Sequence, residues 1–540
     1  MIQVRDLSVE IGAHDILRGI DLALPPGRIT GLVGESGSGK SMAALAIMGL
    51  LPQGMRASGR VDLDGRNLLD LPERALCRIR GRRIGMIFQE PMTALNPLMT
   101  IGDQVAEVLR IHQGLDRRAA LDHARDRLDR VGLTAPRFPL TLYPHQLSGG
   151  QRQRVAIALA IALRPDLLIA DEPTTALDVT TQARILDLLR GLVRDEGMAL
   201  LLITHDLAVV AGIADQVAVM QRGAIVEQGP AEQVFRQQRH AYTRALFAAS
   251  THQPRLVLPS TEPQPLLQIT GAVREYPLPR RGLTGRRESL RAVDGVSFRI
   301  DAGESVGLVG ESGCGKSTLT RAILGLDPLQ GGGIRFEGQD IRAGRSMPRA
   351  LRARMQAVFQ DPFGSFDPRW RVERLLAEPF HLTGRPRDWR EQVAEALFEV
   401  GIPGDALRRH IHEFSGGQRQ RIAIARALII KPRLIVLDEA VSALDVRVRA
   451  QVLDLLAQLR RSHGLAYLFI SHDLSVVRQI TDRVMIMQKG RIVESGPTHA
   501  VLDRPQHPYT QSLLAAAPRI PAEWQAPAQA DKAATTPAPS

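Results

Sequence analysis

A short loop motif that occurs twice constrains this chain more than any other feature. Residues 34–41 read Gly-Glu-Ser-Gly-Ser-Gly-Lys-Ser, and residues 310–317 read Gly-Glu-Ser-Gly-Cys-Gly-Lys-Ser. Glycines at this spacing let the backbone curl so that successive N–H groups point at phosphate oxygens, at the N-terminal end of a helix. We therefore expect two phosphate-binding loops, each within an α/β domain.

The residues around each loop support this interpretation. In the first copy an apolar strand, Ile29–Val33, precedes the loop, and a helical pattern, Ser41–Leu51, follows it. The chain has 69 basic residues but only five lysines, and two of the five, Lys40 and Lys316, stand at the loop position. A lysine there supplies positive charge to a bound phosphate.

A hydroxyl group ends each loop. Mg²⁺ is a hard cation that takes oxygen ligands, so Ser41 and Ser317 are candidate ligands for the Mg²⁺ that accompanies a nucleotide. The loop residues expected to bind the nucleotide are Gly34, Gly37, Gly39, Lys40 and Ser41 in the first copy, and Gly310, Gly313, Gly315, Lys316 and Ser317 in the second.

Composition is that of an ordinary globular protein. The 540 residues are 44% hydrophobic and 23% charged, which suits roughly two to four domains. The net charge of +12 comes from dispersed arginines, so we expect no specific nucleic-acid binding. Cys77 and Cys314 form no metal-site spacing, which favours free thiols in a reducing compartment. No run of about 18 apolar residues occurs, so we expect a soluble chain that reaches a membrane only through partners.

Polar residues follow several predicted elements of the first half. Asp171-Glu172 ends the apolar strand Leu167–Ala170, and paired carboxylates there are costly to bury unless a metal or a reaction uses them. Ser148-Gly149-Gly150 stands before the apolar helix Val155–Leu163, a second anion-binding geometry. Gln89 follows the strand 84–88, and His205 follows the strand Ala199–Ile203.

The same series recurs in the second half. Its members are Gln360, Ser415-Gly416-Gly417, Asp438-Glu439 and His472. From the serine onward the offset is constant at 267 residues (148 to 415, 171 to 438, 205 to 472). A repeat this long indicates two domains of one fold rather than a solenoid. We expect a first domain over 1–250, a linker rich in Pro, Thr and Gln over 251–265, a second domain over 266–520, and a disordered Pro/Ala-rich tail over 521–540.

This set of motifs resembles the nucleotide-binding domain of ATP-binding cassette (ABC) proteins over nearly the whole of both halves. The resemblance implies an α/β fold of tandem P-loop NTPase domains, each with a RecA-like core, an antiparallel β subdomain and a helical subdomain. It implies ATP hydrolysis with Mg²⁺. The signatures of the family would be Leu147–Gln151 and Phe414–Gln418.

The resemblance also implies a role for each site residue. Glu172 and Glu439 would be the bases that polarise the attacking water, and His205 and His472 would sense the γ-phosphate. Besides the loop residues, the nucleotide would be contacted by Gln89, Ser148, Gly149, Gly150, Tyr276, Gln360, Ser415, Gly416 and Gly417. The magnesium shell would comprise Ser41, Gln89, Asp171, Ser317, Gln360 and Asp438.

In this family the two cassettes share their sites. Ser148 to Gly150 would close over ATP held by Lys316, and Ser415 to Gly417 over ATP held by Lys40, so the two cassettes are expected to pair within one chain. Tyr276 fits the place where the family stacks an aromatic ring on adenine, whereas Ile11 stands near that place in the first half.

A branch of the family is indicated by His240-Ala-Tyr-Thr243 and His507-Pro-Tyr-Thr510. They resemble the C-terminal element of oligopeptide, dipeptide and nickel importer ATPases. The resemblance implies two transmembrane permease subunits and an extracytoplasmic solute-binding protein as partners, with this chain at the cytoplasmic face of the membrane. Peptides, nickel chelates, glutathione and peptide-like antibiotics all remain open as the solute.

Two other classes of twin-cassette protein are alternatives. A ribosome-associated translation factor would have a long charged helical segment between the cassettes, whereas 251–265 is short and Pro-rich. A DNA-repair ATPase would need zinc-binding cysteines, and this chain has two cysteines.

The segments after the two glutamines are expected to touch the permeases. Residues 90–100 and 361–371 would register the γ-phosphate at one end and a partner at the other. Their apolar side chains are either docking residues or ordinary core: Met92, Leu95, Phe363, Phe366 and Trp370.

Overall fold

The computed structural model describes residues 2–89, 94–175, 177–254, 264–278, 289–344, 347–361, 364–442 and 444–524. Among these residues the chain divides into two compact units. The first unit takes 2–177, 181–251 and 518–524, and the second unit takes 178–180 and 252–517. Each unit has two sheets and its own apolar cores.

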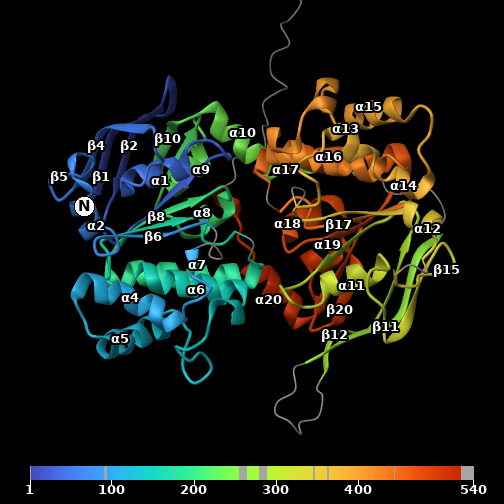
Figure 1. Cartoon of the computed structure of the whole chain (residues 1–540), viewed down its shortest axis with the longest axis horizontal. Coiled ribbons are helices and arrows are strands. Elements are labelled where there is room, and N and C mark those ends of the chain that lie inside the picture. The colour runs from blue at the N-terminus through green and yellow to red at the C-terminus, as the bar shows by residue number, and fades with distance from the viewer. Residues whose placement is uncertain are drawn as a thin grey trace, which may run out of the picture. The chain divides into compact units, whose positions relative to one another are not determined.

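The larger sheet of the first unit has six strands in the order β10-β9-β3-β8-β7-β6. Figure 1 labels β6, β8 and β10 of this sheet. All neighbours are parallel except β10, which runs antiparallel to β9. Three central strands are buried along their whole length, as their unbroken apolar sequences predict. The strands are β3 (Ile29–Val33), β6 (Ile84–Ile87), β7 (Leu167–Asp171), β8 (Ala199–Thr204), β9 (Gln216–Gln221) and β10 (Ala224–Pro230).

The smaller sheet of the first unit is antiparallel, in the order β2-β1-β4-β5. In β1 the apolar side chains of Val4, Leu7 and Val9 are buried, and they pack with the helix α1 in one apolar core. This core fixes α1, and with it the end of the first loop. The strands are β1 (Ile2–Ile11), β2 (His14–Leu24), β4 (Met55–Leu63) and β5 (Arg66–Asn67).

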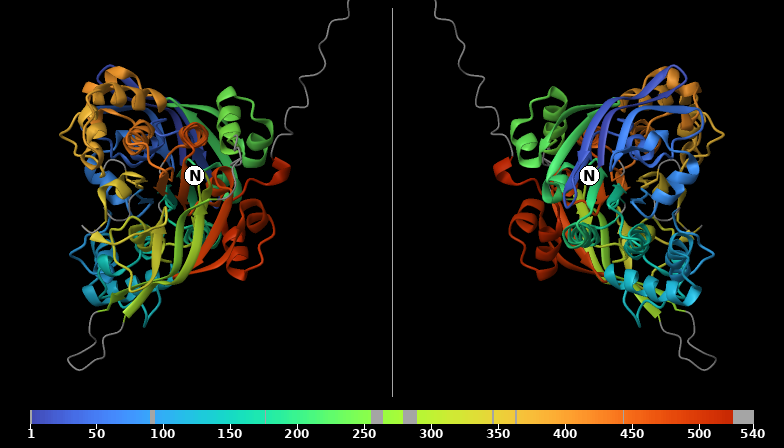
Figure 2. Two further views of the ribbon diagram at one scale, coloured as in Figure 1. Left: turned by 90° about the vertical axis from the view of Figure 1, so that its right-hand side faces the viewer. Right: turned by 90° about the vertical axis from the view of Figure 1, so that its left-hand side faces the viewer.

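Helices cover the other face of the larger sheet in the first unit. Helices α4 and α5 lie at the opposite end of this unit from the antiparallel sheet (Figures 1 and 2). Together with α6 and α7 they bury a second apolar core. The helices are α1 (Lys40–Met48), η1 (Leu68–Asp70), α2 (Glu73–Ile79), α4 (Ile101–Gln113), α5 (Arg117–Arg130), η2 (Pro144–Gln146), α6 (Gly149–Ala160), α7 (Val179–Glu196), α8 (Leu207–Ile213), α9 (Ala231–Gln237) and α10 (Ala241–Ser250).

The second unit repeats both sheets. Its larger sheet has the order β16-β17-β18-β13-β19-β20, with only β20 antiparallel, and its smaller sheet has the order β12-β11-β14-β15. The strands are β11 (Pro265–Pro277), β12 (Ser289–Asp301), β13 (Ser305–Val309), β14 (Gly331–Phe336), β15 (Gln339–Asp340), β16 (Met355–Val358), β17 (Leu434–Asp438), β18 (Ala466–Ile470), β19 (Arg483–Gln488) and β20 (Arg491–Pro497).

The helices of the second unit are arranged as in the first. Helices α13, α15 and α16 form a layer away from the antiparallel sheet (Figures 1 and 2). The helices are α11 (Lys316–Ile323), α12 (Arg349–Ala353), α13 (Val372–Ala377), α14 (Phe380–Thr383), α15 (Trp389–Glu399), η4 (Gly404–Arg408), η5 (Ile411–Glu413), α16 (Gly416–Leu428), α17 (Val446–His463), α18 (Leu474–Ile480), α19 (Thr498–Asp503) and α20 (Pro508–Ala516).

Each unit thus has a mostly parallel core sheet, an antiparallel sheet and a helical layer, and the expected α/β fold class is confirmed. The linker predicted over 251–265 lies largely outside the described residues. Of the tail predicted over 521–540, residues 521–524 are described, and Ala522–Trp524 forms a 3₁₀ turn, η6. No helix in the described part of the chain is long and apolar enough to cross a membrane.

Candidate active sites

The loop of the first unit connects β3 to α1, as its sequence predicts. Gly39 is the N-cap of α1 and has a left-handed backbone with φ of 105°, which glycine adopts without strain. The Lys40 Nζ atom donates to the carbonyl oxygens of Gly34 and Glu35, both at 2.8 Å. The lysine is buried, so its charge is held against the loop rather than in solvent.

The loop of the second unit, between β13 and α11, has the same arrangement. Lys316 Nζ donates to the carbonyl oxygens of Gly310 at 2.7 Å and Glu311 at 2.9 Å. The Sγ atom of Cys314 lies 3.9 Å from Lys316 Nζ, and burial raises the pKa of the Cys314 thiol. The corresponding residue of the first loop is Ser38, which is also buried.

The acidic pair of the first unit stands at the carboxyl end of β7. Glu172 has a left-handed backbone with φ of 49°, which is uncommon for a residue with a side chain. Three groups contact its carboxylate: His205 Nδ1 at 3.0 Å, Gln89 Nε2 at 2.9 Å and the Thr175 hydroxyl at 2.9 Å. The structure therefore brings the predicted base, the predicted sensor and the strand-end glutamine together.

These contacts keep Glu172 ionised. Burial alone raises the pKa of Glu172, but the hydrogen bond and charge of His205, with the Thr175 hydroxyl and the charge of Lys40, outweigh it and lower that pKa to about 2. An ionised carboxylate at neutral pH is able to accept a proton from water.

Asp171 differs from its neighbour. Burial raises the pKa of Asp171, while a hydrogen bond from the Ser41 hydroxyl opposes the shift. Its Oδ1 atom is buried and has no hydrogen-bond partner among the described residues. A buried carboxylate oxygen without a partner, next to a serine hydroxyl, suits an oxygen-preferring cation such as Mg²⁺.

The acidic pair of the second unit, at the end of β17, repeats the backbone conformation and the histidine contact of the first. Glu439 has φ of 49°, and His472 Nδ1 lies 3.2 Å from its carboxylate. Burial raises the pKa of Glu439, but His472 outweighs burial and lowers it. Burial and the charge of Glu439 raise the pKa of Asp438 to about 6. Gln360 is exposed, just beyond the end of β16.

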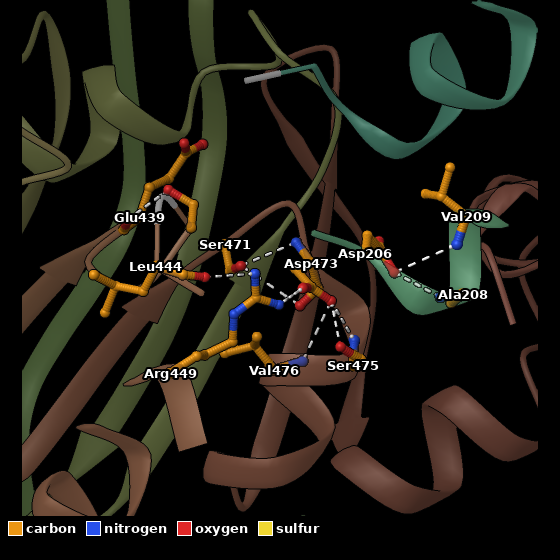
Figure 3. A network of polar contacts seen from close by, with 11 residues as sticks. Asp206, Ala208, Val209, Glu439, Leu444, Arg449, Ser471, Asp473, Ser475 and Val476 are labelled. Atoms are coloured by element: carbon orange, nitrogen blue, oxygen red, sulfur yellow. Dashed lines mark hydrogen bonds and ion pairs between the residues drawn. The ribbon is translucent and has the colours of Figure 1, made fainter. Parts of the chain in front are cut away.

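The helix after each histidine is capped by the next residue (Figure 3). Asp206 accepts hydrogen bonds from the N–H groups of Ala208 and Val209 at the start of α8. Asp473 does the same for α18 and also forms an ion pair with Arg449 at 2.8 Å. These caps fix the chain direction immediately after His205 and His472.

Each signature begins a helix with a capping box. The Ser148 hydroxyl accepts from Gln151 N, and Gln151 Oε1 accepts from Ser148 N; Ser415 and Gln418 repeat the pair at α16. The role of the glutamines was missed at the level of sequence, although Ser-x-x-Gln before an apolar run is a recognised capping signal.

Within each signature, the first and the second glycine have different environments. A Cβ atom on Gly150 would lie 2.3 Å from Thr181 Cγ2, and one on Gly417 would lie 2.2 Å from Val448 Cγ1. Packing therefore requires a glycine at the second glycine position of each signature, Gly150 and Gly417. A Cβ atom on Gly149 would meet only Leu177 at 3.8 Å, and one on Gly416 would meet nothing within 4 Å of the described structure.

Tyr276 lies in β11, where its hydroxyl donates to Asp327 at 3.2 Å. The guanidinium of Arg274 stands 4.6 Å from the centre of its ring. In the first unit Ile11 ends β1 with 38% of its surface exposed. The second unit thus has a partly exposed aromatic ring in β11, whereas the first has an aliphatic side chain at the end of β1.

Two of the candidate docking residues are core. Leu95 is 4% exposed and packs in the helical core of the first unit. Phe366 is 5% exposed in the helical core of the second unit, with the Arg426 guanidinium 4.5 Å from its ring centre. A docking role for these two side chains is wrong because helices of their own unit cover them. Met92 and Phe363 lie outside the described residues.

Two loops of this geometry, each on the same sheet edge as a partly buried acidic pair, define a P-loop nucleoside triphosphatase. The chain belongs to the ABC transporter family, which matches residues 17–175 and 293–442. It is thus an ATP-binding, ATP-hydrolysing chain of that family, as its motifs predicted. Residues 226–265 and 493–539 match the C-terminal region of oligopeptide/dipeptide transporters.

Curated relatives are similar over nearly the whole chain. The peptidoglycan transport ATP-binding protein YejF of Agrobacterium fabrum is 48% identical over 536 residues, covering 97% of this chain and 97% of that protein. The glutathione import ATP-binding protein GsiA of Escherichia coli is 46% identical over 541 residues, covering 93% of this chain and 86% of that protein. The solved structure of cbiO1 from Clostridium perfringens, 27% identical, covers 45% of this chain and 92% of its own with a TM-score of 0.40.

Proposed function

We propose that this chain hydrolyses MgATP at two sites and thereby drives the import of short peptides or peptide-like solutes through a membrane complex. The observation that carries the proposal is the ionised glutamate of each unit. Glu172 and Glu439 each stand at a strand end with a histidine on the carboxylate, at 3.0 Å and 3.2 Å.

The loops would bind the phosphates of ATP. Lys40 and Lys316 are held on loop carbonyl oxygens, and a phosphate group placed in the loop would offer each ammonium a charged acceptor in their place. The N–H groups of the loop and of the helix terminus would cradle the same phosphates. The glycines at 34, 37 and 39, and at 310, 313 and 315, leave room for that approach.

The magnesium ion would be held by Ser41 and Asp171 in the first unit and by Ser317 and Asp438 in the second, with Gln89 and Gln360 completing the shell. When bound, Mg²⁺ neutralises charge that develops on the phosphates. Ionised Glu172 would accept a proton from the attacking water. His205 holds the Glu172 carboxylate in place, so loss of the histidine would disorient the base.

The signatures would complete the two sites. We propose that Ser148, Gly149 and Gly150 close over the ATP held by Lys316, and Ser415, Gly416 and Gly417 over the ATP held by Lys40. Support comes from Gly149 and Gly416, because neither needs to be glycine for the fold of its own unit. A residue type that packing does not require is explained by close approach of a ligand. Tyr276 would stack on adenine with the ring face opposite Arg274.

The partners would be two permease subunits and a solute-binding protein outside the membrane, with this chain at the cytoplasmic face. A groove of about 280 Å³ lies beside the start of α4 and is lined by Leu98, Thr100, Asp103, Arg110 and Tyr143. Leu98 is 86% exposed and follows Gln89 by nine residues. We propose that a short cytoplasmic helix of a permease docks here, in place of the contacts expected for Leu95.

The solute class follows from the relatives and from the C-terminal region. Their names refer to oligopeptides and dipeptides, glutathione and peptidoglycan, which share amide-linked amino acids. We therefore propose a solute with a peptide backbone.

Reconstituted vesicles test the proposal. With the permeases and binding protein present, ATP-dependent uptake of a labelled peptide is expected, and Glu172→Gln with Glu439→Gln should lower turnover by about 10²- to 10⁴-fold while ATP stays bound. Uptake of a nickel chelate but no peptide would contradict the solute class. Turnover at the wild-type rate in the double variant would contradict the assignment of the bases.

A further inference from the structure

The tyrosine of each C-terminal His-x-Tyr-Thr element reaches the phosphate loop of its own unit. Tyr242, in α10, accepts a hydrogen bond on its hydroxyl oxygen from the N–H of Glu35 at 3.0 Å. Tyr509, in α20, accepts one from the N–H of Glu311 at 3.1 Å. The same contact is therefore found twice, once in each unit.

The peptide group that each tyrosine contacts is the one that holds the loop lysine. The N–H of the Gly34–Glu35 peptide bonds to Tyr242, and the carbonyl oxygen of that peptide accepts from Lys40 Nζ at 2.8 Å. In the second unit the Gly310–Glu311 peptide joins Tyr509 to Lys316 in the same way, at 3.1 Å and 2.7 Å. Hydrogen bonds in a chain polarise one another, so the tyrosine strengthens the contact that places the ammonium.

The rest of the element holds the tyrosine in position. His240 caps α10, since its Nδ1 accepts from the N–H of Tyr242 at 3.1 Å, and the carboxylate of Glu227 accepts from the N–H of His240 at 3.0 Å. His507 and Glu494 make the equivalent bonds at 3.2 Å. The side chains of Tyr242 and Tyr509 are buried, so water does not readily replace their hydroxyl groups.

We propose that Tyr242 and Tyr509 are positioning residues for ATP binding: each hydroxyl fixes the peptide that presents the loop lysine, and so ties the C-terminal element to the nucleotide site. This inference rests on the proposed function, in which the loops bind ATP. It gives the His-x-Tyr-Thr element a direct influence on the affinity for nucleotide, in addition to its packing role.

The test removes the hydroxyl and keeps the ring. Tyr242→Phe and Tyr509→Phe, each in the full-length Glu172→Gln/Glu439→Gln chain, are titrated with MgATP by calorimetry. Because a partly buried N–H loses its acceptor, we expect the Kd of the site in the affected unit to rise about three- to tenfold while the other site is unchanged. In the hydrolysing chain, KM for ATP should rise more than kcat falls.

Tyr467→Phe is the matched control. Tyr467 is buried in the second unit and its hydroxyl donates to Leu456 O at 2.9 Å, away from the loop. This variant should lower the thermal midpoint to an extent similar to Tyr509→Phe and leave the Kd for ATP unchanged. Equal ATP affinity in the Tyr509→Phe, Tyr467→Phe and parent chains would overturn the inference and leave the tyrosines as packing residues.

A second control separates this inference from the proposed function. Lys40→Ala with Lys316→Ala should abolish ATP binding. If this double lysine variant bound ATP with the parent Kd, the proposed nucleotide sites would be wrong. If it lost ATP while both tyrosine variants kept the parent Kd, only the positioning role would fail.

Discussion

The two units are closely alike at the loops and differ on the segments that follow the glutamines. Each lysine makes the same two carbonyl contacts, and each glutamate has φ of 49° with a histidine on its carboxylate. Even the change from Ala241 to Pro508 leaves the tyrosine contact within 0.1 Å, at 3.0 Å and 3.1 Å. The chemistry of phosphate binding therefore constrains both units equally.

The outward-facing segments are not alike. After Asn96-Pro97 the first unit exposes Leu98, whereas after Asp367-Pro368 the second unit has Arg369. Hydrogen bonds from the Arg369 side chain and backbone lower the pKa of Asp367 to about 2, so this exposed surface carries an ion pair. One unit presents an apolar side chain and the other a charged one. The comparison teaches that the two units keep the same residue contacts at their loops, whereas the exposed segments after the glutamines differ in charge and polarity.

The largest effect is expected from a charge placed on the exposed segment of the first unit. Leu98→Glu should lower solute uptake and substrate-stimulated ATPase about tenfold or more, as truncating a central interface residue does. Basal ATPase should stay unchanged, because Leu98 is 86% exposed and supports no core. Ile111→Glu is the control, since Ile111 is 71% exposed on the same helix layer and does not line the groove. Equal losses in both variants would contradict a specific docking role.

The signature glycines give a prediction that should hold in both units. Gly150→Ala and Gly417→Ala should lower the free energy of unfolding by about 1–3 kcal/mol, because the added methyl group overlaps a stiff β-branched side chain. Gly149→Ala and Gly416→Ala should keep the stability but reduce ATP hydrolysis. Thermal unfolding and phosphate release measure the two effects. Full activity in the Gly149 and Gly416 variants would remove the argument that a ligand approaches these glycines.

Asp438 provides a prediction about pH. Its pKa is raised from 3.8 to about 6 in the folded state, so the folded chain holds a proton that the unfolded chain has lost, and stability falls as pH rises between about 4 and 6. Without Mg²⁺ and nucleotide, Asp438→Asn should therefore raise stability at pH 7.5, by on the order of 2 kcal/mol, and make no difference near pH 4. Asp171→Asn should act in the same direction. A lower thermal midpoint of either variant at pH 7.5 would contradict the sign of the shift.

The smallest effect concerns a difference between the units near the histidines. Arg449 pairs with Asp473, and the residue 267 positions earlier is Gln182. Burial raises the pKa of Asp473, but the charge of Arg449 and the hydrogen bond from the Ser475 hydroxyl outweigh burial and lower it. Arg449→Gln should lower the free energy of unfolding by about 1 kcal/mol, since the ion pair is only partly buried. Hydrogen exchange should locate the change in α17 and α18, and unchanged exchange there would show that the pair contributes nothing.

Elements with unbroken apolar sequence were predictable from the sequence. The strand Ile29–Val33 has the expected bounds, and the strand expected over Ala199–Ile203 ends one residue later, at Thr204. The helix expected at Val155–Leu163 begins at Gly149 instead, because the capping box of Ser148 and Gln151 starts it before the apolar residues. Motifs located the loops and the acidic pairs, since their chemistry depends on residue types at fixed spacing.

Contacts between distant segments were not predictable from the sequence. The sequence left Leu95 and Phe366 open as docking or core residues, because burial under a neighbouring helix leaves no local signal. Two local features were also missed, the left-handed backbone of Glu172 and the hydrogen bond from Thr175, because residue types alone do not specify either one. The Tyr242 contact joins residues 207 apart, and the His-x-Tyr-Thr pattern alone does not reveal it.

The central claim is that the two units hold equivalent hydrolytic sites, and the direct test is to compare the two single base variants. Glu172→Gln and Glu439→Gln are each assayed for steady-state phosphate release from MgATP in the full-length chain. Because the two carboxylates share the same backbone conformation, histidine contact and direction of pKa shift, both variants should lose turnover to the same extent, within about twofold. Wild-type turnover in one variant and loss of about 10²-fold or more in the other would contradict the claim.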